Sequence, residues 1–331
     1  MNKVILLDKR PAGVPEVSDF KFVEEEMPSA KAGEVLLKTR FVSVDPYLRG
    51  RMRDVKSYVA PFQLGEPITS ALVVEVVRSL NDKIKEGDFF VGYLPWKEYQ
   101  TSTGEGLTKI DPEAASLSAY LGVLGATGLT AYIGLKEIGL PKAGQTVVVS
   151  GAAGAVGNVV GQIAKIMGCR VIGLAGSDAK IETLKSKYQY DEGINYKTTK
   201  NLAAEIEKLC PEGVNIYFDN VGGEVSDAVY ANLTYKARII VCGAIALYNE
   251  DEPALAPRVE WRLVVNSATM TGFLLSDFAD LLPAGVQQLT TWFKEGKLSQ
   301  SETIIKGFDQ IPEAFIGLFE GQNNGKMVVE I

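Results

Sequence analysis

A glycine-rich turn between an apolar run and a helical pattern is the feature that most constrains this chain. Residues 146–157 read TVVVSGAAGAVG, and residues 158–167 continue with apolar side chains at helical spacing. The order strand, turn, helix brings backbone N–H groups to a helix N-terminus, where a phosphate group binds. Gly151, Gly154 and Gly157 let the backbone approach a pyrophosphate and let the helix pack on the strand. The pattern predicts a dinucleotide-binding turn, although its spacing also fits a tight helix–strand crossing without a ligand.

The chain from about residue 122 predicts a doubly wound α/β fold. A buried strand at residues 147–149 is followed by further strand candidates at 170–174, 193–196, 214–218, 237–242 and 268–273. Helical patterns separate most of them, over residues 125–135, 158–167, 202–209, 225–233 and 278–294. Strands that alternate with helices form a parallel sheet with right-handed crossovers. We therefore expect a six-stranded parallel sheet.

The first 120 residues are β-rich instead. Residues 34–43 and 70–77 are strand candidates, and turn signals recur between them, which is typical of a closed or partly closed barrel. The segment VDPYLRG at 44–50 has two interpretations. It fits a surface loop in which Pro46 sets the turn and Tyr47 packs on the barrel. It also fits a loop that lines a cleft and presents Tyr47 or Arg49.

The end of the second strand bears on the choice of dinucleotide. An NAD site usually carries Asp or Glu about 20 residues after the glycine turn. Here the segment LAGS at 174–177 is uncharged, and Lys180 lies one turn inside a helix that Ser177 is expected to cap. Lysine, a hydroxyl group and a helix N-terminus all attract a 2′-phosphate. The pattern favours NADP over NAD. Asp178 is the counter-indication, since it could turn toward the ribose, and Lys180 also fits a solvated helix lysine.

The absence of histidine narrows the chemistry. It excludes a His-based triad, a His general base and a His-ligated metal. Cys169, Cys210 and Cys242 are far apart in the sequence and lack the spacing of a zinc site, so we expect reduced structural cysteines and no metal.

Charge and hydropathy limit the partners and the compartment. The net charge is −7, without a basic block, which argues against nucleic-acid binding. No run approaches the ~20 apolar residues of a membrane span. The apolar run before Asp8 is too short for a secretory signal, so a cytoplasmic protein without membrane association is expected.

Several motifs together resemble one family. They are VDPYLRG at 44–50, GATGLTAY at 125–132, the run from Gly151 to Lys180, INYKT at 194–198, FDNVGG at 218–223, CGAIALYN at 242–249 and NNGKMVV at 323–329. The chain is similar, nearly from end to end, to the zinc-free medium-chain dehydrogenase/reductases. Within them it resembles the leukotriene B4 12-hydroxydehydrogenase/prostaglandin reductase and plant alkenal double-bond reductase group.

The resemblance implies two domains. Residues 1–121 and 299–331 would form a GroES-like β-barrel domain that holds the substrate, and residues 122–298 a Rossmann domain that holds NADP(H). Zinc-dependent relatives carry Gly-His-Glu at the barrel, where this chain has Gly65-Glu66-Pro67. This departure agrees with hydride transfer without a metal. Relatives also suggest a homodimer, paired at the strand edge that follows Trp261.

The resemblance further assigns site residues. Lys180 and Tyr196 would hold the 2′-phosphate and the nearby ribose, beside Ser177. The other cofactor contacts would be Gly154, Ala155, Val156 and Gly157 at the pyrophosphate, Asn220 at a strand end, Cys242, Gly243, Ala244, Ile245 and Tyr248 under the nicotinamide, Phe273 on the next strand end, and Asn323 from the C-terminal segment.

Tyr248 is the first candidate for catalysis and Tyr47 the second. Tyr248 also fits an ordinary loop or lid tyrosine. As a donor, its phenol would stabilise the enolate formed when hydride reaches the β-carbon of an unsaturated carbonyl compound. Aromatic surface for a small hydrophobic substrate is offered by Tyr58, Phe62, Tyr93 and Trp96, each of which also fits packing in the core or at the barrel rim.

The sequence thus predicts NADPH-dependent reduction of the C=C bond of enones and enals. Two alternatives stay open: an NADPH quinone reductase, which needs no enolate donor, and an NADPH-binding protein without turnover. Alcohol dehydrogenation is disfavoured because it usually relies on zinc or on a general base.

Overall fold

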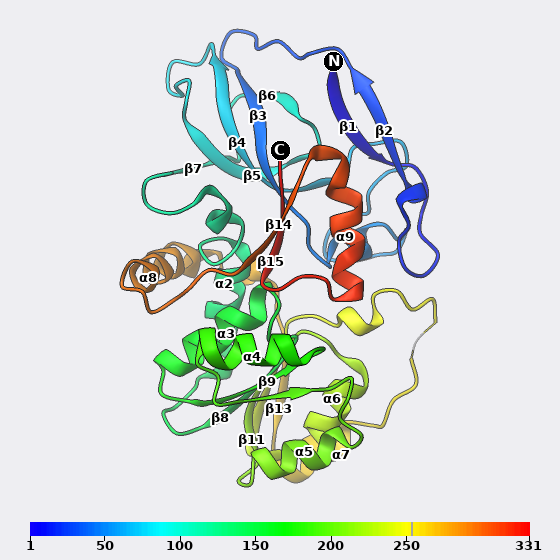
Figure 1. Cartoon of the computed structure of the whole chain (residues 1–331), viewed down its shortest axis with the longest axis vertical. Helices are drawn as coiled ribbons and strands as arrows, with labels where there is room; N and C mark the ends of the chain where they lie inside the picture. The colour runs from blue at the N-terminus through cyan, green and yellow to red at the C-terminus, as the bar shows by residue number, and fades with distance from the viewer. Residues whose placement is uncertain (253) are drawn as a thin grey trace. The chain divides into compact units, whose positions relative to one another are not determined.

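The computed structural model describes residues 1–252 and 254–331, which fold into two compact units (Figure 1). The first unit contains Met1–Leu121, Glu302–Asn323 and Met327–Ile331, and the second contains Gly122–Ser301 and Asn324–Lys326. No helix in the described ranges has both the length and the apolar character needed to cross a bilayer.

A parallel sheet forms the centre of the second unit. Among the described residues it has six strands in the order β10-β9-β8-β11-β12-β13, as the sequence predicted. β8 is buried along its whole length. From β8 the chain continues on one side of the sheet to β9 and β10, and then crosses to β11 on the other side of β8. The boundary between β8 and β11 is therefore the topological switch point, where such sheets bind ligands. The strands are β8 (Thr146–Ser150), β9 (Arg170–Ala175), β10 (Glu192–Asn195), β11 (Val214–Asp219), β12 (Leu233–Val241) and β13 (Thr269–Gly272).

Helices cover this sheet. The helices α3 and α4 pack on β8, β9 and β10 (Figure 1). Side chains of α5, α6 and α7 form one apolar cluster with side chains of the strands. The helices are α2 (Ala126–Ile133), α3 (Ala155–Ile166), α4 (Asp178–Tyr188), α5 (Leu202–Leu209), α6 (Gly223–Tyr230), α7 (Glu260–Asn266) and α8 (Leu282–Lys294). Shorter helical turns are η3 (Gly134–Gly139), η4 (Ile245–Leu247) and η5 (Leu275–Leu281).

Several helix boundaries differ from the sequence prediction, three of them for a clear reason. α3 begins at Ala155 rather than Asn158, because Gly154 takes the N-cap position. The helix expected over 225–233 ends at Tyr230, because Leu233 pairs with Val214 and starts β12. The helical pattern over 278–294 is broken near Phe278, whose backbone is non-helical, so that α8 begins at Leu282.

The first unit is built on antiparallel strands. β14, β15, β3, β4, β5 and β7 form one sheet in that order, with β6 paired to β3, and β1 pairs with β2. β15 joins β3 with Val328 opposite Ser43, so the chain end completes the sheet of the first 120 residues. The strands are β1 (Asn2–Leu7), β2 (Phe20–Glu25), β3 (Val35–Ser43), β4 (Thr69–Ser79), β5 (Phe89–Pro95), β6 (Tyr99–Ser102), β7 (Thr108–Ile110), β14 (Glu302–Lys306) and β15 (Lys326–Glu330).

The helices of this unit are short. α9 packs Phe315 into the same apolar core as Leu37 and Trp96. The helices of the first unit are α1 (Leu48–Arg51) and α9 (Ile311–Glu320), with helical turns η1 (Val17–Asp19), η2 (Leu117–Leu121) and η6 (Phe308–Gln310).

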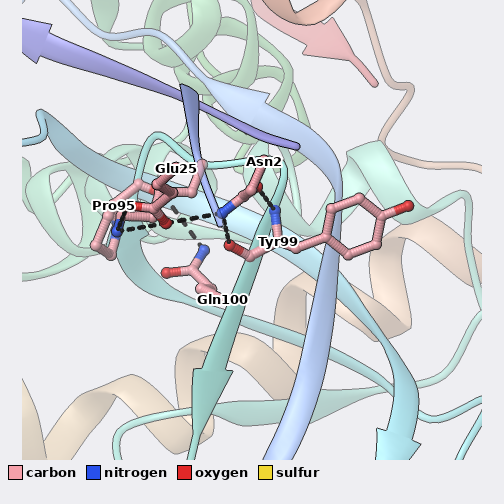
Figure 2. A network of polar contacts seen from close by, with 6 residues as sticks. Asn2, Glu25, Pro95, Tyr99 and Gln100 are labelled. Atoms are coloured by element: carbon pink, nitrogen blue, oxygen red, sulfur yellow. Dashed lines mark hydrogen bonds and ion pairs between the residues drawn. The ribbon is translucent and has the colours of Figure 1, made fainter. Parts of the chain in front are cut away.

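A buried asparagine ties the β1–β2 ribbon to the start of β6 (Figure 2). The Asn2 side-chain amide donates to Glu25 Oε1 and to the Tyr99 carbonyl, both at 2.8 Å, and its Oδ1 accepts from the Tyr99 N–H at 2.8 Å. Lys97 completes the network with an ion pair to Glu25 at 2.9 Å. Because Asn2 is fully buried, these bonds replace its lost contacts with water.

Asn2→Ala is expected to lower the free energy of unfolding by about 2 kcal/mol, because the partly buried N–H and carbonyl groups of Tyr99 lose these bonds. Urea denaturation followed by circular dichroism measures the change. Lys21→Ala, at an exposed position on the same ribbon, is the matched control. An equal effect of both substitutions would refute this role of Asn2.

Candidate active site

The glycine turn follows β8 and leads into α3. Gly151 has φ +58°, and the Gly154 N–H donates to its carbonyl at 2.9 Å. A Cβ on Gly157 would lie 2.3 Å from the Gly151 oxygen and 2.7 Å from Ala152 Cα. These neighbours are backbone atoms of the turn, so position 157 accepts only glycine without a shift of the main chain.

The start of α3 has the chemistry of a pyrophosphate site. Its N-cap, Gly154, brings no side chain, and the first N–H groups of a helix have no partner inside the helix. These N–H groups, including those of Ala155 and Val156, carry the positive end of the helix dipole. The turn therefore fits the cofactor group that the sequence predicts for it.

The C-terminal NNGK segment reaches this turn. The Gly325 N–H donates to the Ala153 carbonyl at 2.7 Å, and Gly325 forms an isolated parallel bridge with Gly154. Gly325 has φ +78°, and a Cβ there would lie 2.2 Å from the Ser301 carbonyl oxygen. Asn323 lies in the first unit, and its predicted cofactor contact stays a prediction.

The end of β9 carries the residues expected near the 2′-phosphate. Ser177 caps α4, as predicted, and its Oγ accepts from the Lys180 N–H at 3.3 Å. The Lys180 side chain is half-buried; burial, and then the charge of Lys197, lower its pKa. Tyr196 follows β10, and its hydroxyl oxygen lies 3.0 Å from where a Cβ of Gly176 would be. Burial raises the pKa of Tyr196, which keeps its phenol neutral.

Asp178, the counter-indication to NADP, is engaged elsewhere. Its Oδ1 accepts from Asn195 Nδ2 at 2.7 Å. Lys197, which the sequence analysis did not single out, lies beside these residues. The signals for it are its place in the INYKT motif, directly after Tyr196, and at the end of a strand that neighbours β9.

Asn220 lies at the end of β11, as expected. Its N–H donates to Ser150 Oγ at 2.9 Å and its side-chain amide donates to the Ser150 carbonyl at 2.8 Å, so it is fixed to the end of β8. Asp219, which the sequence analysis did not single out, is a buried carboxylate behind it. The donors to that carboxylate are Ser150, Tyr217, Val221, Gly222, Ser226 and Tyr230.

The segment 242–248 docks on the end of β11. The N–H groups of Cys242 and Gly243 donate to the Asp219 carbonyl at 2.8 and 3.1 Å, and the Ala246 N–H donates to the Val221 carbonyl at 3.0 Å. Further backbone bonds of this segment run from Ile245 to the Asn220 carbonyl at 3.4 Å and from Leu247 to Ala244 at 2.8 Å. The predicted nicotinamide segment is therefore held at the carboxyl end of the sheet.

Tyr248 turns back over this segment. Its hydroxyl oxygen accepts from the Ala244 N–H at 3.3 Å and lies 3.1 Å from where a Cβ of Gly243 would be. A phenol that accepts a hydrogen bond still carries one proton to donate. Phe273 directly follows β13, and its ring meets that of Phe278 edge-on with centroids 6.3 Å apart.

A tyrosine cluster surrounds Tyr47 in the first unit. Burial, followed by the charge of Asp45, raises the pKa of Tyr47 well above its ordinary value, so its phenol stays neutral. Tyr93 shares a hydrogen bond with Tyr47. Arg51 and Tyr58 also act electrostatically on Tyr47.

Arg51 is a second residue that the sequence analysis missed. Its guanidinium lies 4.0 Å from the ring centroid of Phe62 and donates to the Ala60 carbonyl and to Thr69 Oγ1, both at 3.1 Å. The structure thus brings Tyr47, Tyr58, Tyr93 and Phe62 near one half-buried cation.

Two candidates from the sequence have structural roles instead. Arg49 is fully buried and donates to the carbonyls of Gly13, at 2.9 Å, and Pro11, at 3.3 Å, so the idea that it faces a cleft is wrong. Trp96 is also fully buried, and its indole N–H donates to Ser70 Oγ at 2.8 Å. Of the two interpretations of Trp96, packing in the core is therefore the correct one.

The three cysteines are not paired in disulfides; Cys169 and Cys210 are buried and Cys242 is partly buried. Burial raises the pKa of Cys210 to about 11 and, together with the charge of Asp219, that of Cys242 to about 12; it also raises the pKa of Cys169. Across the described ranges, no group of three or more His, Cys, Asp or Glu side chains could hold a metal ion.

These shifts predict slow labelling of the native protein by a thiol-specific disulfide reagent at about pH 8, because the thiolate is the reactive form. All three thiols should react once the chain is unfolded, and Ser186→Cys, on the exposed face of α4, provides a fast-reacting control. The neutral thiols stabilise the fold fully below their unfolded pKa of about 8.5. That contribution is lost as pH rises through the folded values near 11 and 12. Fast labelling of native Cys242 would contradict its raised pKa.

Comparisons with known proteins agree with this architecture. Residues 3–110 match the family described as "N-terminal domain of oxidoreductase", and residues 155–293 match the family described as "Zinc-binding dehydrogenase". The chain is 52% identical to the "Putative NADP-dependent oxidoreductase YfmJ" of Bacillus subtilis (strain 168) over 329 residues, which cover 99% of this chain and 97% of that protein.

Two further relatives have narrower names. The chain is 40% identical to the 2-alkenal reductase (NADP(+)-dependent) of Nicotiana tabacum, covering 100% of this chain and 97% of that one. The crystal structure of CurA in complex with NADPH from Vibrio vulnificus matches with a TM-score of 0.94 and 38% identity, covering 99% of this chain and 98% of that one. The chain therefore belongs to the zinc-free reductase group of the medium-chain dehydrogenase/reductases, in which a GroES-like domain accompanies a Rossmann-like domain.

Proposed function

We propose that this oxidoreductase reduces the C=C bond of small hydrophobic α,β-unsaturated ketones and aldehydes with NADPH. The observation that carries the proposal is the placement of the Tyr248 phenol, which is anchored to Ala244 N–H in a segment docked on the carboxyl end of the parallel sheet. In this proposal residues 122–298 hold the cofactor, and residues 1–121 and 299–331 hold the substrate.

The cofactor is NADP(H). The relatives from Bacillus and tobacco are NADP-dependent by name, and the Vibrio structure contains NADPH. In this chain the glycine turn suits the pyrophosphate, while Lys180, Ser177 and Tyr196 suit the 2′-phosphate and its ribose. The bond between Asp178 and Asn195 supports this choice, because it occupies the carboxylate that could otherwise favour NAD.

When bound, NADPH would supply a hydride for the β-carbon of the substrate. The C=C π electrons then move toward the carbonyl, and negative charge collects on its oxygen. A neutral phenol that donates to this oxygen stabilises the enolate. A proton from Tyr248 or from water then reaches the α-carbon, so that a saturated carbonyl compound and NADP⁺ result.

The tyrosine cluster of the first unit supports a substrate role for that unit. Tyr47 and Tyr93 provide neutral hydrogen-bond donors, and the exposed ring of Tyr58 provides apolar surface, whereas Phe62 is buried in the core of the unit. A site with few polar groups among aromatic side chains suits a small hydrophobic carbonyl compound. Tyr47 is therefore proposed as the second substrate contact.

The test is NADPH oxidation, followed by absorbance, with a small enone, its saturated ketone and a small quinone, and parallel runs with NADH. The proposal expects the enone to be consumed with NADPH and its C=C bond, not its carbonyl, to be reduced in the isolated product. Turnover of the quinone alone would establish the quinone reductase instead. Tight NADPH binding without turnover of any acceptor would contradict an enzymatic role.

A homodimer in the cytoplasm completes the proposal. β13 is one of the two edge strands of the sheet that the described residues form, and α7, which precedes it in the chain, exposes Trp261 and Val264, at 69% and 71%. An unpaired strand with apolar neighbours suits pairing with a second copy.

Trp261→Asp combined with Val264→Asp is expected to convert the dimer to a monomer, because a buried, unpaired charge opposes association. Sedimentation velocity measures the mass of each variant. Val286→Asp, at an exposed position on α8, is the matched control. A wild-type protein that sediments as a monomer at all concentrations would overturn this part of the proposal.

A further inference from the structure

The end of β10 places a second lysine beside the start of α4. β9 and β10 run parallel, with Asn195 opposite Ala175, and the Tyr196 N–H donates to the Ala175 carbonyl at 3.2 Å. The residues after β10 therefore lie next to Gly176, directly before the Ser177 cap. Lys197 Cε is 3.2 Å from where a Cβ of Gly176 would be.

Lys197 and Lys180 meet at this strand end. Lys180 lies in the first turn of α4, and the positive charge of Lys197 is close enough to lower its pKa. The two ammonium groups repel each other, and an anion bound between them offsets this repulsion. A phosphate monoester carries a charge of about −2 near neutral pH, so it neutralises both.

Asn195 organises both sides of this arrangement. Its Nδ2 donates to Asp178 Oδ1 at 2.7 Å, and its Oδ1 accepts from the Lys197 N–H at 3.2 Å. One amide therefore holds a carboxylate and also fixes the backbone that carries a cation. The Asn195 carbonyl additionally accepts from Thr199 Oγ1 at 2.8 Å, which closes the turn after β10.

We propose that Lys197 is a second ligand of the 2′-phosphate and that Asn195 is the positioning residue that restrains Asp178 and orders the Lys197 turn. The inference rests on the proposed use of NADP(H) and deepens it. Selectivity for NADP(H) over NAD(H) then comes from two lysines together with a tethered carboxylate. Lys180, Tyr196 and Ser177, the contacts expected from the resemblance, account for only part of it.

The first test measures binding rather than activity. The dissociation constants of NADPH and NADH are determined by titration of the intrinsic fluorescence for the wild type, Lys197→Gln and Lys200→Gln. Lys200 is exposed in the same turn and is the matched control. Lys197→Gln should weaken NADPH binding about tenfold, the size of one charge-assisted hydrogen bond, and leave NADH within about twofold. Equal effects on both cofactors, or none, would overturn the role of Lys197.

The second test addresses Asn195. Asn195→Leu should weaken NADPH binding and strengthen NADH binding, because the released Asp178 carboxylate can accept from a ribose hydroxyl and repels a phosphate. Adding Asp178→Asn in that background should restore NADPH affinity. A loss that Asp178→Asn leaves unchanged would refute the restraint. Circular dichroism and thermal melting show whether each variant is folded.

Failure of the inference is distinguishable from failure of the proposed cofactor. A wild-type protein that binds NADPH and NADH equally would remove the cofactor assignment itself. A wild-type protein that prefers NADPH, with the Lys197→Gln variant equally selective, would leave the cofactor in place and reject only the second lysine.

Discussion

Tyr248→Phe is expected to lower kcat/KM for an enone by about 10²–10³-fold, equivalent to roughly 3–4 kcal/mol of transition-state stabilisation. The substitution removes one hydroxyl and keeps the ring, so the backbone segment 242–248 retains its bonds to Asp219, Asn220 and Val221. NADPH affinity should stay within about threefold of wild type, since the bond that the Ala244 N–H loses is a long one, at 3.3 Å. The loss should therefore appear in turnover rather than in cofactor binding.

Steady-state kinetics with varied enone at saturating NADPH measure this effect. Tyr235→Phe, at an exposed position in β12, is the matched control and should change nothing. The double variant with Tyr47→Phe tests whether the two phenols act on the same carbonyl, because coupled groups lose less together than the sum of their single losses. Enone turnover that survives Tyr248→Phe would show that another group stabilises the enolate.

The parallel sheet was predictable because its signals are local. The central strands β8 and β11 are short apolar runs buried on both faces, and the segments between strands repeat at helical spacing. The glycine turn was predictable for the same reason, since its geometry depends on neighbouring residues. The incorrect end of α6 has a tertiary cause: pairing of Leu233 with Val214 extends β12 into residues that also fit a helix.

Site residues that depend on distant segments were not predictable. The Asp219 carboxylate binds Ser150, which is 69 residues away in the sequence, and Lys197 approaches Gly176 only because β10 pairs with β9. Both residues lie inside motifs quoted above, INYKT and FDNVGG, but neither motif reveals which distant segment the side chain contacts. Arg49 and Arg51 illustrate the same limit, because these two arginines lie in one four-residue helix but in different environments. The sequence does not reveal that Arg49 faces carbonyls of the core while Arg51 stacks on Phe62.

Asp219→Asn is expected to lower the free energy of unfolding by about 3 kcal/mol or more, the largest stability effect predicted for this protein. Oδ1 accepts from Ser150 Oγ, Tyr217 OH and the N–H groups of Val221 and Gly222 at 2.9–3.0 Å, and Oδ2 accepts from Ser226 Oγ at 2.6 Å. In asparagine an NH₂ group replaces one carboxylate oxygen, so a hydrogen-bond donor points at neighbours that are themselves donors. Hydrogen bonds to a charged group contribute about 1.5–3 kcal/mol each, and buried groups left without a partner add to the loss.

Urea denaturation measures this loss, and Asp227→Asn on α6 is the matched control. Asp227 is half-buried, and burial raises the pKa of its carboxyl, so its neutral replacement should be close to isoenergetic or slightly stabilising. Asp219→Asn should also weaken NADPH binding, because the turn that carries Asn220, Val221 and Gly222 loses its hydrogen bonds to the carboxylate. The variant should remain folded without denaturant, so this binding can be measured. An Asp219→Asn protein as stable as Asp227→Asn would mean that the surrounding hydroxyls reorient to satisfy the amide. The carboxylate would then not be what holds the end of β11 against β8.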